Sequence, residues 1–197
     1  MVVAPQGLGD REDTTHWNAG FDISTVDDVG FLTALAREIS GSFAIDPDKV
    51  FTTGVSNGGW MSYHLVALHP EVFKGAGSVI GRMGGATWDL RDTITAAPII
   101  QVSGEDDPWQ RDYSSNRDRG WGGAPDVDAQ MAFWADRNGA TSTETEQVTE
   151  RTTLTRYSGG TAPVHYYVIE GAGHEVTDGE DGTLRSWDVI FRFFADR

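Results

Sequence analysis

The chain has 197 residues, of which 39% are hydrophobic and 23% are charged, and its formal net charge is −15. This length and composition predict a single folded domain over residues 1–197 and exclude a disordered chain or a membrane helix. The negative charge argues against nucleic acid or an anionic membrane as a partner. Because cysteine is absent, disulfides, thiol catalysis and cysteine-ligated zinc are excluded.

The N-terminal quarter begins with an apolar run and contains one helical pattern. Residues 2–5 predict a short buried strand. They lack the basic and apolar segments of a signal peptide, so the sequence leaves the location open. Apolar side chains recur at helical spacing over residues 26–40, which predicts an amphipathic helix. Ser24 or Thr25 is expected to cap this helix, and Gly41 to end it.

The rest of the chain alternates between strand and helix patterns. Residues 141–155 are threonine-rich and predict an edge strand or a mobile loop. Alternation of strands and helices implies an α/β protein, with a mostly parallel sheet and helices on both faces. Strands are predicted at residues 50–53, 75–80, 98–103 and 164–169, and helices at residues 60–68, 127–138 and 184–194.

A G-x-S-x-G sequence at residues 54–58 stands between a predicted strand and a predicted helix, with Ser56 at its centre. In a nucleophile elbow the serine occupies a strained strand-to-helix turn, so the residues two positions away must be small. The bare pattern is weak in a chain that contains 24 glycines. The flanking strand and helix strengthen it, and Ser56 becomes the candidate nucleophile.

Two later strand ends provide a candidate acid and a candidate base. A serine hydroxyl is a poor nucleophile unless a base takes its proton and an acid orients that base. Asp107 and His174 each follow a predicted strand, and functional groups gather at the carboxyl ends of parallel strands. The order Ser56, Asp107, His174 is the order of the α/β-hydrolase triad. Asp106 is the alternative acid.

The other four of the five histidines are weaker candidates for the base. His64 and His69 are expected at the surface or the end of the helix at 60–68, and His165 inside a strand. His16 lies in a loop beside Trp17 and is the rival of His174, although it precedes the nucleophile in the chain.

Seven tryptophans suggest an aromatic substrate surface. Trp17, Trp60 and Trp109 are the candidate substrate contacts, and Trp109 is preferred because it lies two residues beyond Asp107. Trp134, on a predicted helix, is expected to fill the core instead.

Several segments in succession make the chain resemble a known family. The sequence looks like the secreted polyhydroxybutyrate depolymerase and feruloyl esterase family of α/β-hydrolases, over essentially its whole length. This resemblance implies hydrolysis of a polyester, phenolic or short-chain carboxylic ester through Ser56, Asp107 and His174, without metal or cofactor. The matching segments are residues 17–20 (Trp-Asn-Ala-Gly), 26–32 (Val-Asp-Asp-Val-Gly-Phe-Leu), 45–50, 53–59 (Thr-Gly-Val-Ser-Asn-Gly-Gly), 104–108 and 170–174.

The chain departs from that family at its N-terminus and in its oxyanion loop. Family members usually have cysteines, earlier strands and a His-Gly oxyanion loop, and none of these occurs here. One oxyanion donor remains, the backbone N–H of Asn57, the residue after the nucleophile. We expect the loop at Gln6 and Gly7 to supply a second N–H, because it follows a strand and glycine permits close approach.

The missing family strand would lie between residues 1–5 and 50–53. We expect that either the first strand moves into this position or the exposed sheet edge pairs with a second copy in a homodimer.

Three alternatives to an ester hydrolase stay open. One is a serine peptidase of the same fold. Another is a catalytically weakened hydrolase-like binding module, which the missing oxyanion loop favours. The third is a carbohydrate-binding or structural domain, which the ordered triad disfavours.

Overall fold

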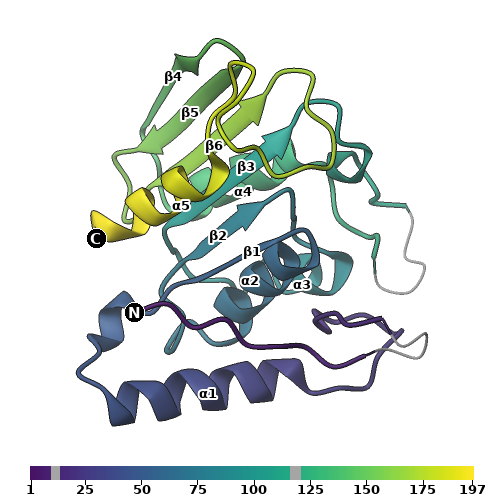
Figure 1. Cartoon of the computed structure of the whole chain (residues 1–197), viewed down its shortest axis with the longest axis vertical. Helices are drawn as coiled ribbons and strands as arrows, with labels where there is room; N and C mark the ends of the chain where they lie inside the picture. Colours follow the sequence, from purple (N-terminus) through teal and green to yellow (C-terminus); the bar gives the residue numbers. More distant parts are fainter. Residues whose placement is uncertain (10–13, 116–120) are drawn as a thin grey trace.

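The structure of the chain is a computed structural model that describes residues 1–9, 14–115 and 121–197 (Figure 1). Its helices are α1 (Asp28–Ser42), α2 (Asn57–Leu68), α3 (Gly85–Asp89), α4 (Val127–Arg137) and α5 (Ser186–Ala195), with short 3-10 turns at Pro47–Lys49 and Pro108–Gln110. Its strands are β1 (Thr52–Val55), β2 (Ala76–Val79), β3 (Ile99–Gly104), β4 (Ser142–Thr149), β5 (Thr152–Ser158) and β6 (Val164–Ile169).

The strands form one sheet in the order β1-β2-β3-β6-β5-β4. Strands β1, β2, β3 and β6 run parallel to one another, whereas β5 pairs antiparallel with both β6 and β4. The expected mostly parallel α/β sheet is therefore confirmed, and the threonine-rich segment proves to be a hairpin with β4 at the edge. The carboxyl ends of β1, β3 and β6 lie on the same side of the sheet, which brings the loops after them together.

Helices cover both faces of the sheet and divide the core into two clusters. On one face, α2 and α4 pack their apolar side chains around Tyr63, Met131 and Trp134. On the other face, α5 places Ile190 and Phe193 against the sheet, and Figure 1 shows α5 in front of the strands and α4 behind them. Trp134 is fully buried, as its helical position predicts. Within the described ranges, none of the helices is long and apolar enough to cross a membrane.

The boundaries of α1 and α2 differ from the predicted ones. Asp27, rather than Ser24 or Thr25, caps α1 by accepting a hydrogen bond from the Gly30 N–H at 2.8 Å. The helix also runs through Gly41, because the space around that residue is open and nothing there stops the chain. The second helix begins at Asn57, three residues before its predicted start, so that it abuts the candidate nucleophile directly.

The N-terminal segment does not form the predicted strand. Residues 2–5 pair with no strand, and the side chain of Val2 is 74% exposed. Among the described strands β1 has one neighbour, β2, and the N-terminal segment runs between β1 and α1 without joining the sheet (Figure 1). The expectation that this segment moves into the position beside β1 is therefore wrong, since no backbone ladder holds it there. Pairing of this edge with a second copy stays a prediction.

Candidate active site

Ser56 lies on a strained turn between β1 and α2. Its φ is +49° and its ψ is −113°, a conformation that costs a non-glycine residue on the order of 1–3 kcal/mol. The turn is held by Ser56 itself, whose N–H donates to Val79 O at 2.8 Å and whose carbonyl accepts from Trp60 N–H at 3.0 Å. A Cβ on Gly54 would lie 2.5 Å from the carbonyl carbon of Gly58, so only glycine fits there. The local geometry is that of a nucleophile elbow.

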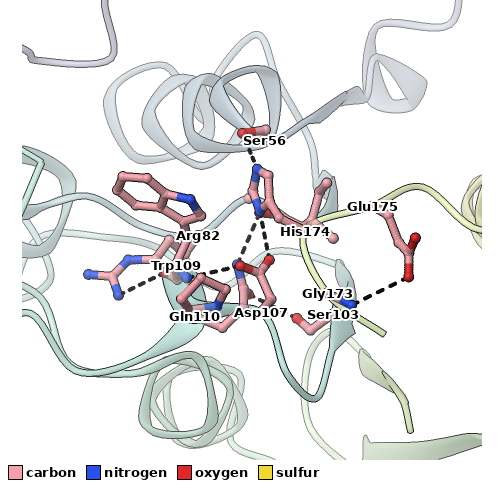
Figure 2. Close-up of polar contacts among 12 residues, drawn as sticks. Ser56, Arg82, Ser103, Asp107, Trp109, Gln110, Gly173, His174 and Glu175 are labelled. Atoms are coloured by element: carbon pink, nitrogen blue, oxygen red, sulfur yellow. Dashed lines mark hydrogen bonds and ion pairs between the residues drawn. The ribbon is translucent and has the colours of Figure 1, made fainter. Parts of the chain in front are cut away.

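Ser56, His174 and Asp107 form a continuous hydrogen-bonded chain (Figure 2). Ser56 Oγ lies 2.8 Å from His174 Nε2, and His174 Nδ1 lies 2.7 Å from Asp107 Oδ2. A carboxylate only accepts hydrogen bonds, so Nδ1 carries the proton and the neutral ring presents Nε2 as the acceptor for the serine hydroxyl. This tautomer is the one that a general base needs.

The acid is buried while the base remains partly open. The side chain of Asp107 has 0% exposure and that of His174 has 30%. The second oxygen of Asp107, Oδ1, accepts the Trp109 N–H at 2.9 Å, so both carboxylate oxygens are satisfied. A buried carboxylate fixed in this way can orient an imidazole and stabilise a positive charge on it.

Backbone hydrogen bonds join the loop that carries the acid to the loop that carries the base. The Glu105 N–H donates to Ile169 O at 3.0 Å, and the Asp106 N–H donates to Ala172 O at 2.9 Å. The carboxylate of Glu105 also accepts the Gly171 N–H at 3.1 Å. Asp106 therefore serves through its backbone, and the structure brings Asp107 rather than Asp106 to His174.

A buried layer of polar side chains supports the acid loop from below. The guanidinium of Arg82 donates to the carbonyls of Trp109 and Arg111, and Arg82 is 1% exposed. Burial lowers the pKa of Arg82. Gln110 donates to Ile80 O at 3.0 Å and accepts from Ser103 Oγ at 3.0 Å.

The sequence did not predict this support layer. The signal in the sequence that could have revealed this layer is a polar residue inside an apolar strand. Gln101, within the predicted strand at 98–103, shows that pattern. Its amide donates to Ser103 Oγ at 2.9 Å and its carbonyl accepts the Tyr63 hydroxyl at 2.8 Å. The network therefore extends from the acid loop into the core.

Ser56 opens onto a cavity of 1020 Å³ between β1 and the N-terminal segment. Gln6 and Gly7, the candidate second oxyanion donors, lie on the wall of the same cavity, as does Asn57. Their part in oxyanion binding stays a prediction. His16 also lines the cavity, and its ring nitrogen Nδ1 lies 3.3 Å from the Thr14 carbonyl. The base that reaches the Ser56 hydroxyl is His174.

The three candidate substrate tryptophans have different environments. Trp17 lines the cavity. Trp109 is 48% exposed, and its ring centroid is 6.5 Å from that of His174, so it can contact a bound molecule. Trp60 is only 5% exposed because it packs against Phe21 and Trp121. Trp60 therefore belongs to the core, contrary to the expected substrate contact.

His64 is buried rather than superficial, because α2 is enclosed on nearly every side. It is 7% exposed, and its Nδ1 lies 2.9 Å from the hydroxyl of Thr87. Burial lowers its pKa from 6.5 to about 4, so it is neutral near pH 7. Within the described part of the chain, no three histidine or acidic side chains gather closely enough to hold a metal ion.

Comparison with known proteins places the chain in a family. A profile described as the prolyl oligopeptidase family matches residues 4–119. The chain belongs to this family. The expected α/β-hydrolase fold is confirmed. Acetyl xylan esterase from Aspergillus awamori is a structural neighbour of this family member, with a TM-score of 0.59, 16% identity, and coverage of 86% of this chain and 68% of that one.

Curated relatives carry the names that the sequence resemblance indicated. Feruloyl esterase B of Piromyces equi is 28% identical over 191 residues, covering 90% of this chain and 33% of that protein. The poly(3-hydroxybutyrate) depolymerase of Ralstonia pickettii is 32% identical over 91 residues, covering 44% of this chain and 19% of that protein. The resemblance is confirmed, and this prolyl oligopeptidase family member spans a third or less of the length of these two relatives.

Proposed function

We propose that the chain is a serine hydrolase that cleaves carboxylic esters through an acyl-enzyme on Ser56. The observation that carries this proposal is the chain of two hydrogen bonds, 2.8 Å and 2.7 Å, from Ser56 through His174 to Asp107 at a strained elbow. The names of the relatives support ester hydrolysis as the reaction class. A polyester or a phenolic or short-chain ester is the proposed substrate.

In the first half-reaction, Ser56 Oγ attacks the ester carbonyl carbon while its proton passes to Nε2 of His174. Asp107 stabilises the resulting imidazolium. The carbonyl oxygen becomes an oxyanion that the Asn57 N–H receives at the N-terminus of α2, where the helix dipole also favours negative charge. Collapse of this intermediate breaks the bond to the alcohol, which leaves with the proton from His174.

In the second half-reaction, water replaces the alcohol. His174 takes a proton from the water, whose oxygen attacks the acyl-enzyme carbonyl. The same N–H receives the second oxyanion, and the carboxylic acid leaves as Ser56 regains its proton. Trp109, exposed beside the imidazole of His174, is the proposed contact for the substrate on that side of Ser56.

The test is release of p-nitrophenol from acetate and butyrate esters by the intact chain and by Ser56→Ala. We expect the intact chain to be active and Ser56→Ala to lose at least about 10³-fold in kcat, since the nucleophile is gone. Equal activity of the two proteins would reject the mechanism. Inactivity of both would favour the weakened binding module. Polyhydroxybutyrate, an aromatic polyester and methyl ferulate on one preparation would then rank the substrate classes.

A serine peptidase is the second candidate, and the match to the prolyl oligopeptidase family favours it. The same three side chains would attack an amide, and His174 would protonate the leaving amine. A prolyl p-nitroanilide offered beside the p-nitrophenyl esters separates the two functions. A kcat/KM for the anilide that exceeds those for the esters would replace the ester proposal with the peptidase one.

A further inference from the structure

The side chain of Asn57 joins the nucleophile elbow to the loops at the N-terminal end of the chain. Its Oδ1 accepts the Trp17 N–H at 2.6 Å, and its Nδ2 donates to the Trp17 carbonyl at 2.9 Å. One amide thus satisfies both backbone groups of a residue forty positions away. Because Oδ1 accepts and Nδ2 donates, the orientation of the amide is fixed, and no other common side chain of this length makes both bonds.

The backbone at Trp17 is in turn tied to the loop that contains Gly7. The N–H of His16 donates to Leu8 O at 3.2 Å, and Gly9 forms an antiparallel bridge with Thr15. A Cβ on Gly7 would lie 2.7 Å from the His16 carbonyl oxygen, so the two backbones touch. Residues 6–9 and 15–17 are therefore joined into one unit, which we name the loop pair.

A second asparagine holds the far end of the loop pair. The backbone N–H of Asn18 donates to the buried carboxylate of Asp28 at 2.7 Å, and the Asn18 amide donates to Val26 O at 3.0 Å. The Phe21 N–H donates to Asn18 Oδ1 at 2.9 Å. The loop pair is thus anchored to the start of α1 on one side and to the start of α2, through Asn57, on the other.

We propose that the Asn57 side chain is a positioning residue that holds the loop pair over Ser56 and so sets the geometry of the oxyanion site. This inference rests on the proposed ester hydrolysis. The backbone N–H of Asn57 is one oxyanion donor, and the loop pair lines the same cavity as Ser56 and contains Gln6 and Gly7. Asn57 therefore contributes twice, once through its own N–H and once by positioning the wall on which the second donor lies.

The expected loss follows from the contribution of one oxyanion donor. Removing such a donor lowers kcat by about 10²–10³-fold, because the donor stabilises charge that develops in the transition state. For Asn57→Ala we expect a fall of about 100-fold in kcat, with KM changed by less than about threefold. Asn57→Asp keeps an acceptor for the Trp17 N–H but turns a carboxylate oxygen toward the Trp17 carbonyl, so we expect a loss at least as large.

Asn138 provides a matched control elsewhere in the chain. Its side chain makes the same pair of bonds, accepting the Ala97 N–H at 3.1 Å and donating to the Ala97 carbonyl at 2.8 Å. It lies at the end of α4, and Ala97 precedes β3, so this clamp sits at the opposite end of the strands from Ser56. Asn138→Ala should lower the unfolding midpoint but leave kcat within about twofold, because it disturbs only stability.

The experiment measures kcat, KM and inhibition by a phenylboronic acid, which forms a tetrahedral adduct on the serine. We expect the inhibition constant to rise in Asn57→Ala and Asn57→Asp in proportion to the fall in kcat/KM, while a fluorophosphonate probe still labels Ser56. Wild-type kcat in both variants, or reduced kcat with an unchanged inhibition constant, would overturn the inference. If Asn57→Ala does not fold, the kcat and the inhibition constant of the isosteric Asn57→Asp variant decide whether the inference holds. Wild-type protein without ester hydrolysis or labelling would instead reject the proposed function.

Discussion

Mild acid should destabilise the fold through His64. Burial lowers the pKa of His64 to about 4, whereas in the unfolded chain it titrates near 6.5. Between these two values the unfolded state binds up to one more proton than the folded state. The free energy of unfolding therefore falls as the pH falls from 6.5 to 4, by up to about 1.4 kcal/mol per pH unit. The full contribution of His64 to the free energy of unfolding is about 3 kcal/mol, which is present above pH 7 and lost below pH 4.

Urea unfolding followed by tryptophan fluorescence at several pH values between 7.5 and 4.5 measures this effect. Other groups also titrate in this range, so the comparison is between the wild type and His64→Gln, whose amide can still bond the Thr87 hydroxyl but takes no proton. We expect His64→Gln to lose less stability than the wild type as the pH falls, with a difference of about 2.5 kcal/mol at pH 4.5. Parallel pH profiles would refute the argument that His64 is buried neutral.

Two further predictions concern the elbow and the acid. Asp107→Asn turns an amide N–H toward His174 Nδ1 and so favours the wrong tautomer of the imidazole. We expect kcat on p-nitrophenyl acetate to fall about 10⁴-fold at nearly unchanged thermal stability. A loss below tenfold would contradict the role of Asp107 as the acid that orients His174. Gly54→Ala should destabilise by about 3 kcal/mol or more because its Cβ meets the Gly58 backbone at 2.5 Å. Gly58→Ala, with open space around it, should cost nothing in the same denaturant titration, and equal losses would show that sterics do not select these glycines.

The periodic segments of the sequence predicted most of the fold. Strands β1, β2, β3 and β6 and helices α1, α4 and α5 appear within a few residues of their expected positions, because their apolar and β-branched residues recur in strand or helix patterns. The N-terminal strand was wrong for a physical reason. Residues 2–5 have strand-like side chains, but a strand requires a hydrogen-bonding neighbour, and a local pattern carries no information about that neighbour.

The candidate triad could be predicted because each member follows a strand that the sequence reveals. Ser56, Asp107 and His174 are brought into contact by the parallel order of β1, β3 and β6. The contacts of Asn57 with Trp17 and of Arg82 with the acid loop could not be predicted in this way, because they join segments far apart through irregular backbone. The burial of His64 was missed because residues 59–66 of α2 are all buried, so this part of the helix has no exposed face.

The loop after β3 and the loop after β6 are hydrogen-bonded to each other, so the candidate triad is held by two separate parts of the structure. Acid and base share one hydrogen-bonded frame through Glu105, Asp106 and Gly171, whereas the serine belongs to the elbow of β1 and α2. The Ser56–His174 contact therefore joins two separately held parts, whereas the His174–Asp107 contact lies within one of them. For the same reason, the loops after β3 and β6 could be grafted together onto a related sheet with their mutual geometry retained. Either loop grafted alone would lack the hydrogen-bonding partners that the other loop provides.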